Sequence, residues 1–124
     1  MDIFGQDYPT PDGTCVRDYI QITDLISAHI LALDYLRSGG ASVVCNCGYG
    51  RGRSVREVID VVKRVSGINF KVNLGPRRAG DPAAIVAKAD RVRALLGWKP
   101  EHDDLDQIVR QALDWERRLH NQTS

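Results

Sequence analysis

The sequence predicts an α/β protein with a small mixed sheet and about four helices. Short apolar stretches typical of strands alternate with longer stretches whose apolar residues recur at helical spacing. Most of the helical stretches begin at a capping residue or end at a glycine. The chain has 124 residues and a hydrophobic content of 43%, which is ordinary for one modest globular domain, so residues 1–124 are expected to form a single domain.

The first third of the chain is expected to contain two strands and one helix. Residues 1–5 are predicted to end a strand, and residues 6–14 are rich in turn-forming proline, glycine and aspartate. Residues 16–22 are predicted as a second short strand. Asp24 is the expected N-cap of a helix that ends at the glycine pair in residues 38–40.

The middle of the chain carries the clearest helix signals. Residues 41–47 resemble a strand, and residues 48–52 form a glycine-rich turn. Ser54 followed by Glu57 is the signature of a capping box at a helix start. The apolar stripe of that helix stops at Gly67, a typical C-terminal signal.

The last part of the chain is expected to finish the sheet and add two helices. The predicted elements are a strand at 68–74, a polar loop at 75–82, a strand at 85–87 and a helix at 90–96. Asp103 or Asp104 is expected to cap a final helix with one apolar face. Because the strands are few and short, their sheet is expected to have exposed edges.

Charge is distributed unevenly along the chain. Residues 1–34 contain six acids and one base, residues 35–99 thirteen bases and four acids, and residues 100–124 six acids and three bases. The basic middle suits an anionic ligand. It lacks the dense Lys/Arg stripe and the aromatic residues that nucleic-acid binding needs, so no nucleic-acid partner is expected.

Neither a membrane segment nor a metal site is predicted. The chain has no apolar run of about 18 residues and no basic-then-apolar start, so we expect no membrane contact and a cytoplasmic location. Cys45 and Cys47 have no neighbouring histidine or second cysteine pair, and are expected to be reduced thiols in a strand.

Three segments contain residues that could bind a phosphate or a sugar. The loop at 77–81 combines two arginines, a glycine and an aspartate, and Arg17 lies on a short strand after a glycine turn. Guanidinium groups offer bidentate hydrogen bonds to phosphate, although an exposed Arg–Asp loop is more often simply solvated. The turn at Gly48 and Gly50 lacks the third glycine of a dinucleotide fingerprint, but an anion could still meet the N–H groups of the helix that follows.

Six motifs occur in an order found in one enzyme family. They are Phe4-Gly5-Gln6-Asp7-Tyr8, Thr10-Pro11-Asp12-Gly13-Thr14, Arg17-Asp18-Tyr19-Ile20, Ser54-Val55-Arg56-Glu57-Val58-Ile59, Gly75-Pro76-Arg77-Arg78-Ala79-Gly80-Asp81-Pro82 and Leu96-Gly97-Trp98-Lys99-Pro100. Together they resemble UDP-glucose 4-epimerases, which belong to the extended short-chain dehydrogenase/reductase family. The resemblance implies the C-terminal, nucleotide-sugar-binding portion of that fold without its main Rossmann domain.

The resemblance implies substrate-binding residues for a UDP-sugar. Arg17 and Arg78 are expected to bind the UDP phosphates, and Asp81 the uridine ribose. The uracil is expected to be held by Asp2, Ile3 and Phe4. Tyr19 is expected to line the site. No catalytic, cofactor-binding or metal-binding residue is expected in this chain.

The same resemblance implies that the chain is inactive alone. The family interconverts UDP-glucose and UDP-galactose with NAD held by an N-terminal domain and with a Tyr-x-x-x-Lys pair. None of the four tyrosines here has a lysine four residues later. Gln21 stands where the family usually has histidine, and this change puts tight packing in doubt.

Two other functions fit the same motifs. The chain could be a non-catalytic UDP-sugar-binding partner subunit that completes a site on another polypeptide. It could also be part of a related nucleotide-sugar dehydratase, decarboxylase or epimerase. A homodimer, or pairing with a Rossmann-domain half, is expected to cover the exposed edges.

Overall fold

The computed structural model describes residues 1–122 and confirms the predicted α/β class. The elements, in chain order, are β1 (Asp2–Phe4), β2 (Val16–Arg17), α1 (Ile22–Arg37), β3 (Arg53–Ser54), α2 (Val55–Ser66), β4 (Asn73–Gly75), β5 (Ala84–Ile85), α3 (Asp90–Leu96) and α4 (Leu105–Gln122). The four expected helices are therefore present. None of them combines the length and the apolar character that crossing a bilayer would need, within the residues that the structure describes.

The strands form two small sheets rather than one. β1 pairs with β4 in parallel, with Ile3 opposite Leu74. β2 lies between β3, which is antiparallel to it, and β5, which is parallel. β1 and β2 are shorter than the strands predicted at 1–5 and 16–22, and β4 and β5 overlap only one end of those predicted at 68–74 and 85–87, because a ladder exists only where a partner strand lies alongside. β3 was not predicted.

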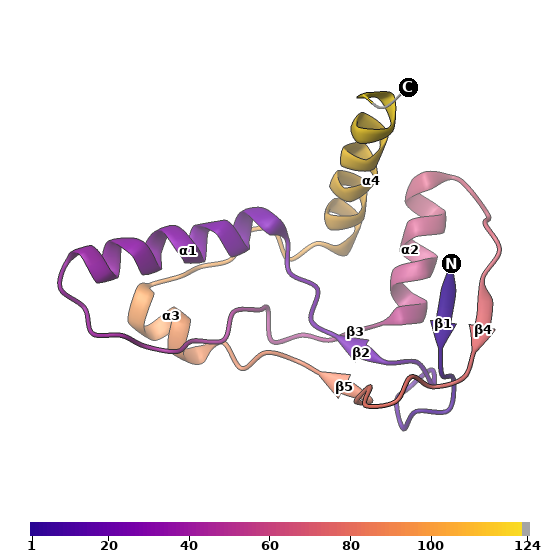
Figure 1. The fold of residues 1–124 in the computed structure, drawn as a ribbon, viewed down its shortest axis with the longest axis horizontal. Helices are drawn as coiled ribbons and strands as arrows, with labels where there is room; N and C mark the ends of the chain where they lie inside the picture. Colours follow the sequence, from indigo (N-terminus) through magenta and orange to yellow (C-terminus); the bar gives the residue numbers. More distant parts are fainter. Residues whose placement is uncertain (123–124) are drawn as a thin grey trace.

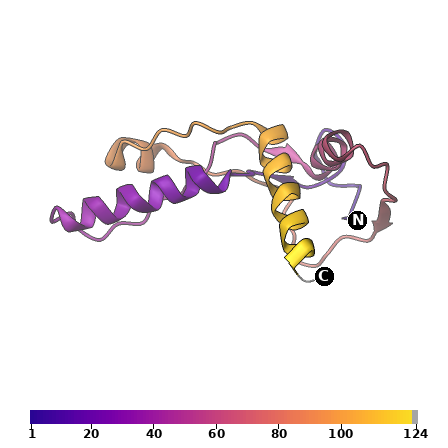
Figure 2. The same cartoon turned by 90° about the horizontal axis from the view of Figure 1, so that it is seen from above.

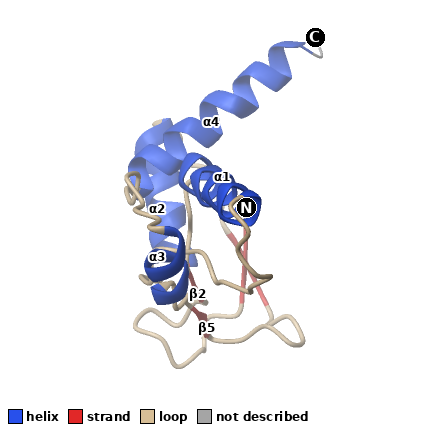
Figure 3. Cartoon of the chain, turned by 90° about the vertical axis from the view of Figure 1, so that its left-hand side faces the viewer, coloured by secondary structure: helices blue, strands red, loops and turns tan. Residues whose placement is uncertain are grey.

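The molecule is elongated, with different elements at its two ends (Figure 1). One end holds α1 and α3, and the other holds α2, α4 and the β1–β4 pair. The sheet of β2, β3 and β5 lies between them. Figure 2 shows α1 and α3 extending as an arm, and Figure 3 shows the C-terminal part of α4 projecting from the rest of the molecule.

The buried apolar residues form one small cluster and several separate positions. At the α1–α3 end, Trp98 is 1% exposed and packs with Ala28, Ala89 and Val92. The buried apolar residues toward the other end are Ile3, Tyr8, Cys15, Ile59 and Val109. Many large apolar side chains remain exposed.

The helix ends show which capping predictions were right. Ser54 and Glu57 form the predicted capping box of α2, and Gly67 ends that helix with a φ of 71°. Asp104 rather than Asp103 caps α4, because its carboxylate accepts from the N–H groups of the first turn. The prediction that Asp24 caps α1 was wrong, since the side chain of Gln21 accepts from the N–H groups of Thr23 and Asp24.

Residues 41–47 are extended but belong to neither sheet. The strand predicted at 41–47 was therefore wrong, because these residues have no strand partner in the part of the chain that the structure describes. Val44 is 82% exposed, whereas Cys45 and Cys47 are half-buried free thiols. Among the described residues, no group of His, Cys, Asp and Glu is arranged to hold a metal ion.

Candidate functional site

Two arginines converge on one aspartate between the two sheets. Nη2 of Arg17 lies 3.0 Å from Oδ1 of Asp81. Nη2 of Arg78 lies 2.9 Å from Oδ2 of the same carboxylate, and its Nε donates to that oxygen over 3.0 Å. Arg17 and Asp81, which are 64 positions apart in the sequence, are thus in direct contact. This arrangement brings together the three residues expected to bind phosphate and ribose.

Local backbone structure explains why these side chains meet. Arg17 is the last residue of β2, and pairing with β5 sets it beside Ile85. The chain that enters β5 turns at Gly80, whose φ of +81° is readily adopted only by glycine. The N–H of Asp81 donates to the carbonyl of Arg78 within that turn. The turn therefore directs Arg78 and Asp81 toward the end of β2.

The β1–β4 pair adds an aromatic face to the arginine cluster. The guanidinium carbon of Arg78 lies 4.9 Å from the ring centroid of Phe4, which is 40% exposed. Asp2 is exposed and accepts a hydrogen bond from Asn73 of β4. The side chain of Ile3 is buried in the core, so only its backbone can face a ligand.

Tyr19 is half-buried, two residues beyond Arg17. Burial raises the pKa of its hydroxyl, and the positive charge of Arg17 opposes that rise. This electrostatic contact places Tyr19 near Arg17, but no hydrogen bond links its hydroxyl to the arginine cluster in the structure described.

The charge of the cluster favours an anion. The hydrogen bonds from Arg78, together with the charges of both arginines, hold the pKa of Asp81 below its usual range, so the carboxylate stays ionised. Two guanidinium groups and one carboxylate leave a net charge of about +1. Each guanidinium carries five N–H donors, more than Asp81 engages. The unused donors can meet phosphate oxygens.

Arg77 lies next to Arg78 but has different partners. Its Nε donates to the Asp7 carboxylate over 2.7 Å, and its Nη2 also donates to the Asp7 carbonyl. The Arg77 guanidinium carbon stacks 4.2 Å from the ring centroid of Tyr8. Two adjacent arginines thus have separate roles, with Arg77 holding the N-terminal loop and Arg78 facing the cluster.

The glycine turn at residues 48–50 does not offer free N–H groups to an anion. The Asp18 carboxylate accepts from the N–H groups of Tyr49, Gly50 and Ala87. A Cβ on Gly48 would come within 2.7 Å of that carboxylate. The first N–H groups of α2 are also engaged, by Cys15, Thr14 and Ser54. The suggestion that an anion binds at this helix start was therefore wrong.

Three buried or half-buried polar residues were missed by sequence reasoning. Asp24 is 3% exposed and accepts hydrogen bonds from the Tyr49 hydroxyl and from the N–H groups of Glu101 and His102. Asp18 holds the glycine turn, as described above. Gln21 is 3% exposed and joins α1 to Gln111 of α4. Hydrogen-bond partners that are this far apart in the sequence leave no local sequence pattern. The one indication was Asp24, a charged residue at the start of a predicted helix with many apolar residues.

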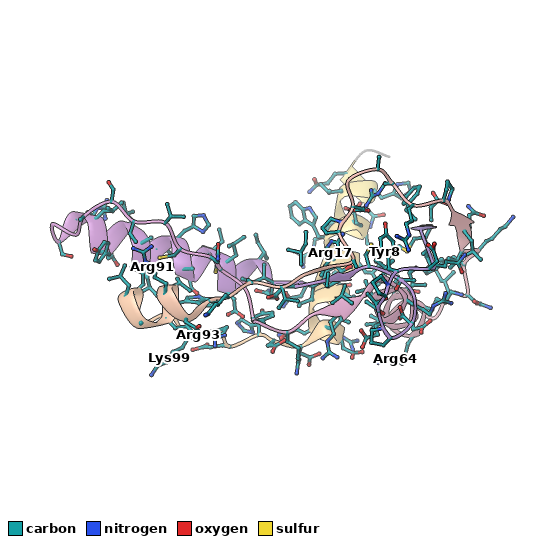
Figure 4. All side chains as sticks on the ribbon, turned by 90° about the horizontal axis from the view of Figure 1, so that it is seen from below. Tyr8, Arg17, Arg64, Arg91, Arg93 and Lys99 are labelled. Carbon is teal, nitrogen blue, oxygen red and sulfur yellow. The ribbon has the colours of Figure 1, made fainter. Side chains whose placement is uncertain are left out.

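A mainly apolar cavity lies away from the arginine cluster. It has a volume of about 320 Å³ and lies between α1, α3 and residues 42–47. Figure 4 shows Arg17 and Tyr8 well separated from Arg91 and Arg93, which lie at the α3 end. None of the three cluster residues lines this cavity, so the cavity and the arginine cluster are separate features of the molecule.

Known proteins share both the sequence and the fold of this chain. The UDP-glucose 4-epimerase of Azospirillum brasilense is 60% identical over 119 residues, which is 96% of this chain and 34% of that enzyme. The structure of the UDP-Glc/GlcNAc 4-epimerase from Campylobacter jejuni superposes with a TM-score of 0.85 at 52% identity, over 95% of this chain and 36% of that one. The homologues of this chain are UDP-glucose 4-epimerases.

The similarity to UDP-glucose 4-epimerases covers only part of their length. The Stenotrophomonas maltophila enzyme, whose structure contains NAD and formylated UDP-arabinopyranose, superposes with a TM-score of 0.91 at 42% identity, over 98% of this chain and 36% of that one. The chain thus spans about a third of its epimerase relatives and matches their C-terminal portion. No protein-family model matches it.

Proposed function

We propose that this chain is the UDP-sugar-binding portion of a UDP-glucose 4-epimerase. The observation that supports this most directly is the pair of guanidinium groups on Asp81, with Phe4 stacked against one of them. In this proposal Arg17 and Arg78 bind the diphosphate and Asp81 the ribose. Phe4 stacks near the uracil, beside backbone groups of Asp2 and Ile3, and Tyr19 lines the wall.

The parent reaction is the NAD-dependent interconversion of UDP-glucose and UDP-galactose, a step of galactose metabolism. NAD would be held by the rest of such an enzyme, because the N–H groups of the glycine turn here are engaged by Asp18. No tyrosine of this chain is followed at the fourth position by lysine, so we expect no epimerisation by the chain alone. Binding, rather than turnover, is the activity to measure.

Titration of the ¹⁵N-labelled chain with UDP tests this proposal. We expect chemical-shift changes at Arg17, Arg78 and Asp81. Uridine, which lacks the diphosphate, serves as a control and should bind more weakly. An absence of shifts at millimolar UDP, which corresponds to binding weaker than about −4 kcal/mol, would contradict binding by the isolated chain.

The adjacent arginines provide a matched pair of variants for the same titration. Arg78→Gln removes a guanidinium from the cluster, and we expect the Kd for UDP to rise at least tenfold, about 1.4 kcal/mol. Arg77→Gln removes the same charge from a side chain that is engaged by Asp7 and Tyr8. We expect it to change the Kd by less than threefold. Equal effects would indicate general electrostatic attraction and no specific site.

A further inference from the structure

Two thiols lie on the same wall of the mainly apolar cavity. Cys45 and Cys47 both line the cavity, and both are half-buried and free. Side chains of alternate residues in an extended segment point to the same side. Burial alternates in this way along the segment, since Asn46 between the two thiols is exposed. The two sulfur atoms therefore face one enclosed space.

The remainder of the cavity offers an apolar enclosure beside the thiols. Its volume is about 320 Å³, whereas a cavity of about 150 Å³ lined by aliphatic and aromatic side chains holds benzene. An aromatic ring therefore has room next to the sulfur atoms. The aliphatic side chains that line the cavity from α1 and α3 are Leu25, Ala28, Ala32, Leu36, Val92 and Leu96.

The spacing and protonation of the two thiols disfavour a disulfide between them. The Cα and Cβ atoms of alternate residues in an extended segment are each about 6.6 Å apart. The Cβ atoms of a disulfide lie only about 3.8 Å apart. Burial, together with the negative charges of Asp24 and Asp18, raises the pKa of the Cys47 thiol. That thiol stays protonated near neutral pH, and a protonated thiol is a poor nucleophile for disulfide exchange.

The number of sulfur ligands selects the element that the pair can hold. Structural zinc sites use about four protein ligands, so two thiols are too few. Trivalent arsenic that carries an aryl group forms three bonds, of which the aryl carbon already supplies one. Two thiols complete that set. An arsenic atom placed between two sulfur atoms also spans a wider gap than a direct S–S bond.

We propose that Cys45 and Cys47 form a dithiol site for trivalent aryl arsenicals. With an aryl arsine oxide, two As–S bonds form while the arsenic–oxygen bond and both S–H bonds break. The oxygen leaves as water with the two thiol protons, and arsenic stays trivalent, so the step needs no oxidant or reductant. The aryl ring lies in the apolar cavity. This site is independent of UDP binding, because none of the arginine-cluster residues lines the cavity.

Phenylarsine oxide is the probe that tests the site. Mass spectrometry of the intact chain should show one phenylarsenic group per chain, removed by dithiothreitol but retained at an equal concentration of a monothiol. Proteolytic mapping should place the arsenic on the peptide that contains both Cys45 and Cys47. Both cysteines pack against the cluster that contains Trp98. The arsenic should therefore quench the Trp98 fluorescence in a Trp115→Phe variant.

The third cysteine provides a matched control. Cys45→Ser and Cys47→Ser each leave a single thiol in the cavity, and each should weaken binding at least 100-fold. Cys15 is buried but does not line the cavity, so Cys15→Ser should change binding by less than threefold. A synthetic peptide of residues 41–50 carries both thiols without the cavity and should bind at least tenfold more weakly than the chain.

Three results would overturn the proposal. They are arsenic mapped to Cys15, binding that survives both Cys45→Ser and Cys47→Ser, and equal binding by the peptide and the chain. The last result would show that the cavity contributes nothing. If a serine variant does not fold, mapping in the unmodified chain still decides, because arsenic must then be found on Cys45 and Cys47 together.

Discussion

Three aspartates of this chain differ in the groups that donate hydrogen bonds to them. Asp18 and Asp24 accept hydrogen bonds mainly from backbone N–H groups of distant segments. Burial alone would raise the pKa of Asp24, but the hydrogen bonds from Glu101, Tyr49 and His102 hold it below its usual value. Asp81 accepts only from guanidinium groups, which keep further donors for a ligand. Asp18 and Asp24 therefore stabilise the fold, whereas Asp81 holds the guanidinium groups of Arg17 and Arg78 together in the proposed site.

Two buried tyrosines allow a paired test at the residue scale. The Tyr49 hydroxyl donates to Asp24 over 2.7 Å and accepts from the N–H of Gln21 over 3.1 Å. Tyr49→Phe leaves the Gln21 N–H without this acceptor and removes one of the hydrogen bonds to the buried Asp24 carboxylate, so it should lower the free energy of unfolding by about 1–3 kcal/mol. The Tyr8 hydroxyl is buried and has no hydrogen-bond partner among the described residues.

Tyr8→Phe should consequently leave the free energy of unfolding within about 0.5 kcal/mol of the original value, or raise it slightly. The aromatic ring that remains in this variant can still stack with the Arg77 guanidinium. Urea denaturation of both variants gives the two values. A loss at Tyr8→Phe as large as that at Tyr49→Phe would show that the Tyr8 hydroxyl has a partner, such as the nearby Cys15 thiol.

Among the elements, those specified by local sequence were predicted well. The helix at Asp90–Leu96 has the predicted bounds, and the capping box at Ser54 and the stop at Gly67 were also predicted correctly. These signals involve residues within about four positions of each other. Strand bounds were predicted poorly, because β2 and β4 end where their partners end.

The candidate site was predicted through its motifs and not through its geometry. Arg78 stood out in a loop and Arg17 on a short predicted strand, but their shared contact with Asp81 depends on β2 pairing with β5. The start of α1 also depends on contacts between distant segments that the sequence did not predict. Asp24 was a good capping residue by type, yet Gln21 caps the helix because Asp24 is drawn inward to the Glu101 and His102 N–H groups.

The capping box of α2 gives a prediction at the element scale. Ser54 Oγ accepts from the Glu57 N–H over 3.0 Å and also donates to the Asp12 carboxylate, and Ser54 is 5% exposed. Ser54→Ala removes both bonds and should lower the free energy of unfolding by about 2 kcal/mol. Ser38→Ala, at the exposed end of α1, is the control and should cost less than about 0.5 kcal/mol. Thermal or urea unfolding measures the free energy of unfolding of both variants. Similar losses of stability would argue against the capping box as the cause of the Ser54→Ala effect.

Across the whole molecule, the three charge blocks of the sequence neutralise one another. Asp7 and Asp103, from the two acidic ends, pair with Arg77 and Arg51 of the basic middle at 2.7 and 3.0 Å. Arg64 likewise pairs with Asp106 across α2 and α4. Each such exposed pair contributes little stability. These pairs occupy part of the positive charge of the basic middle, so the proposed anion site remains the Arg17–Arg78 cluster.

The separate packing of α1 with α3 and of α2 with α4 predicts that the isolated chain does not unfold as one cooperative unit. Trp98 is 1% exposed and its indole N–H donates to the Asp24 carbonyl over 3.0 Å, so it reports on the α1–α3 end. Trp115 is 58% exposed on α4. In a Trp115→Phe variant, the fluorescence of Trp98 should change at a lower urea concentration than the far-ultraviolet circular dichroism. The reason is that α1 has apolar surface uncovered on several sides, whereas α2 has a complete cap and packs along α4. Coincident transitions would show instead that the β2–β3–β5 sheet couples the two ends into a single folding unit.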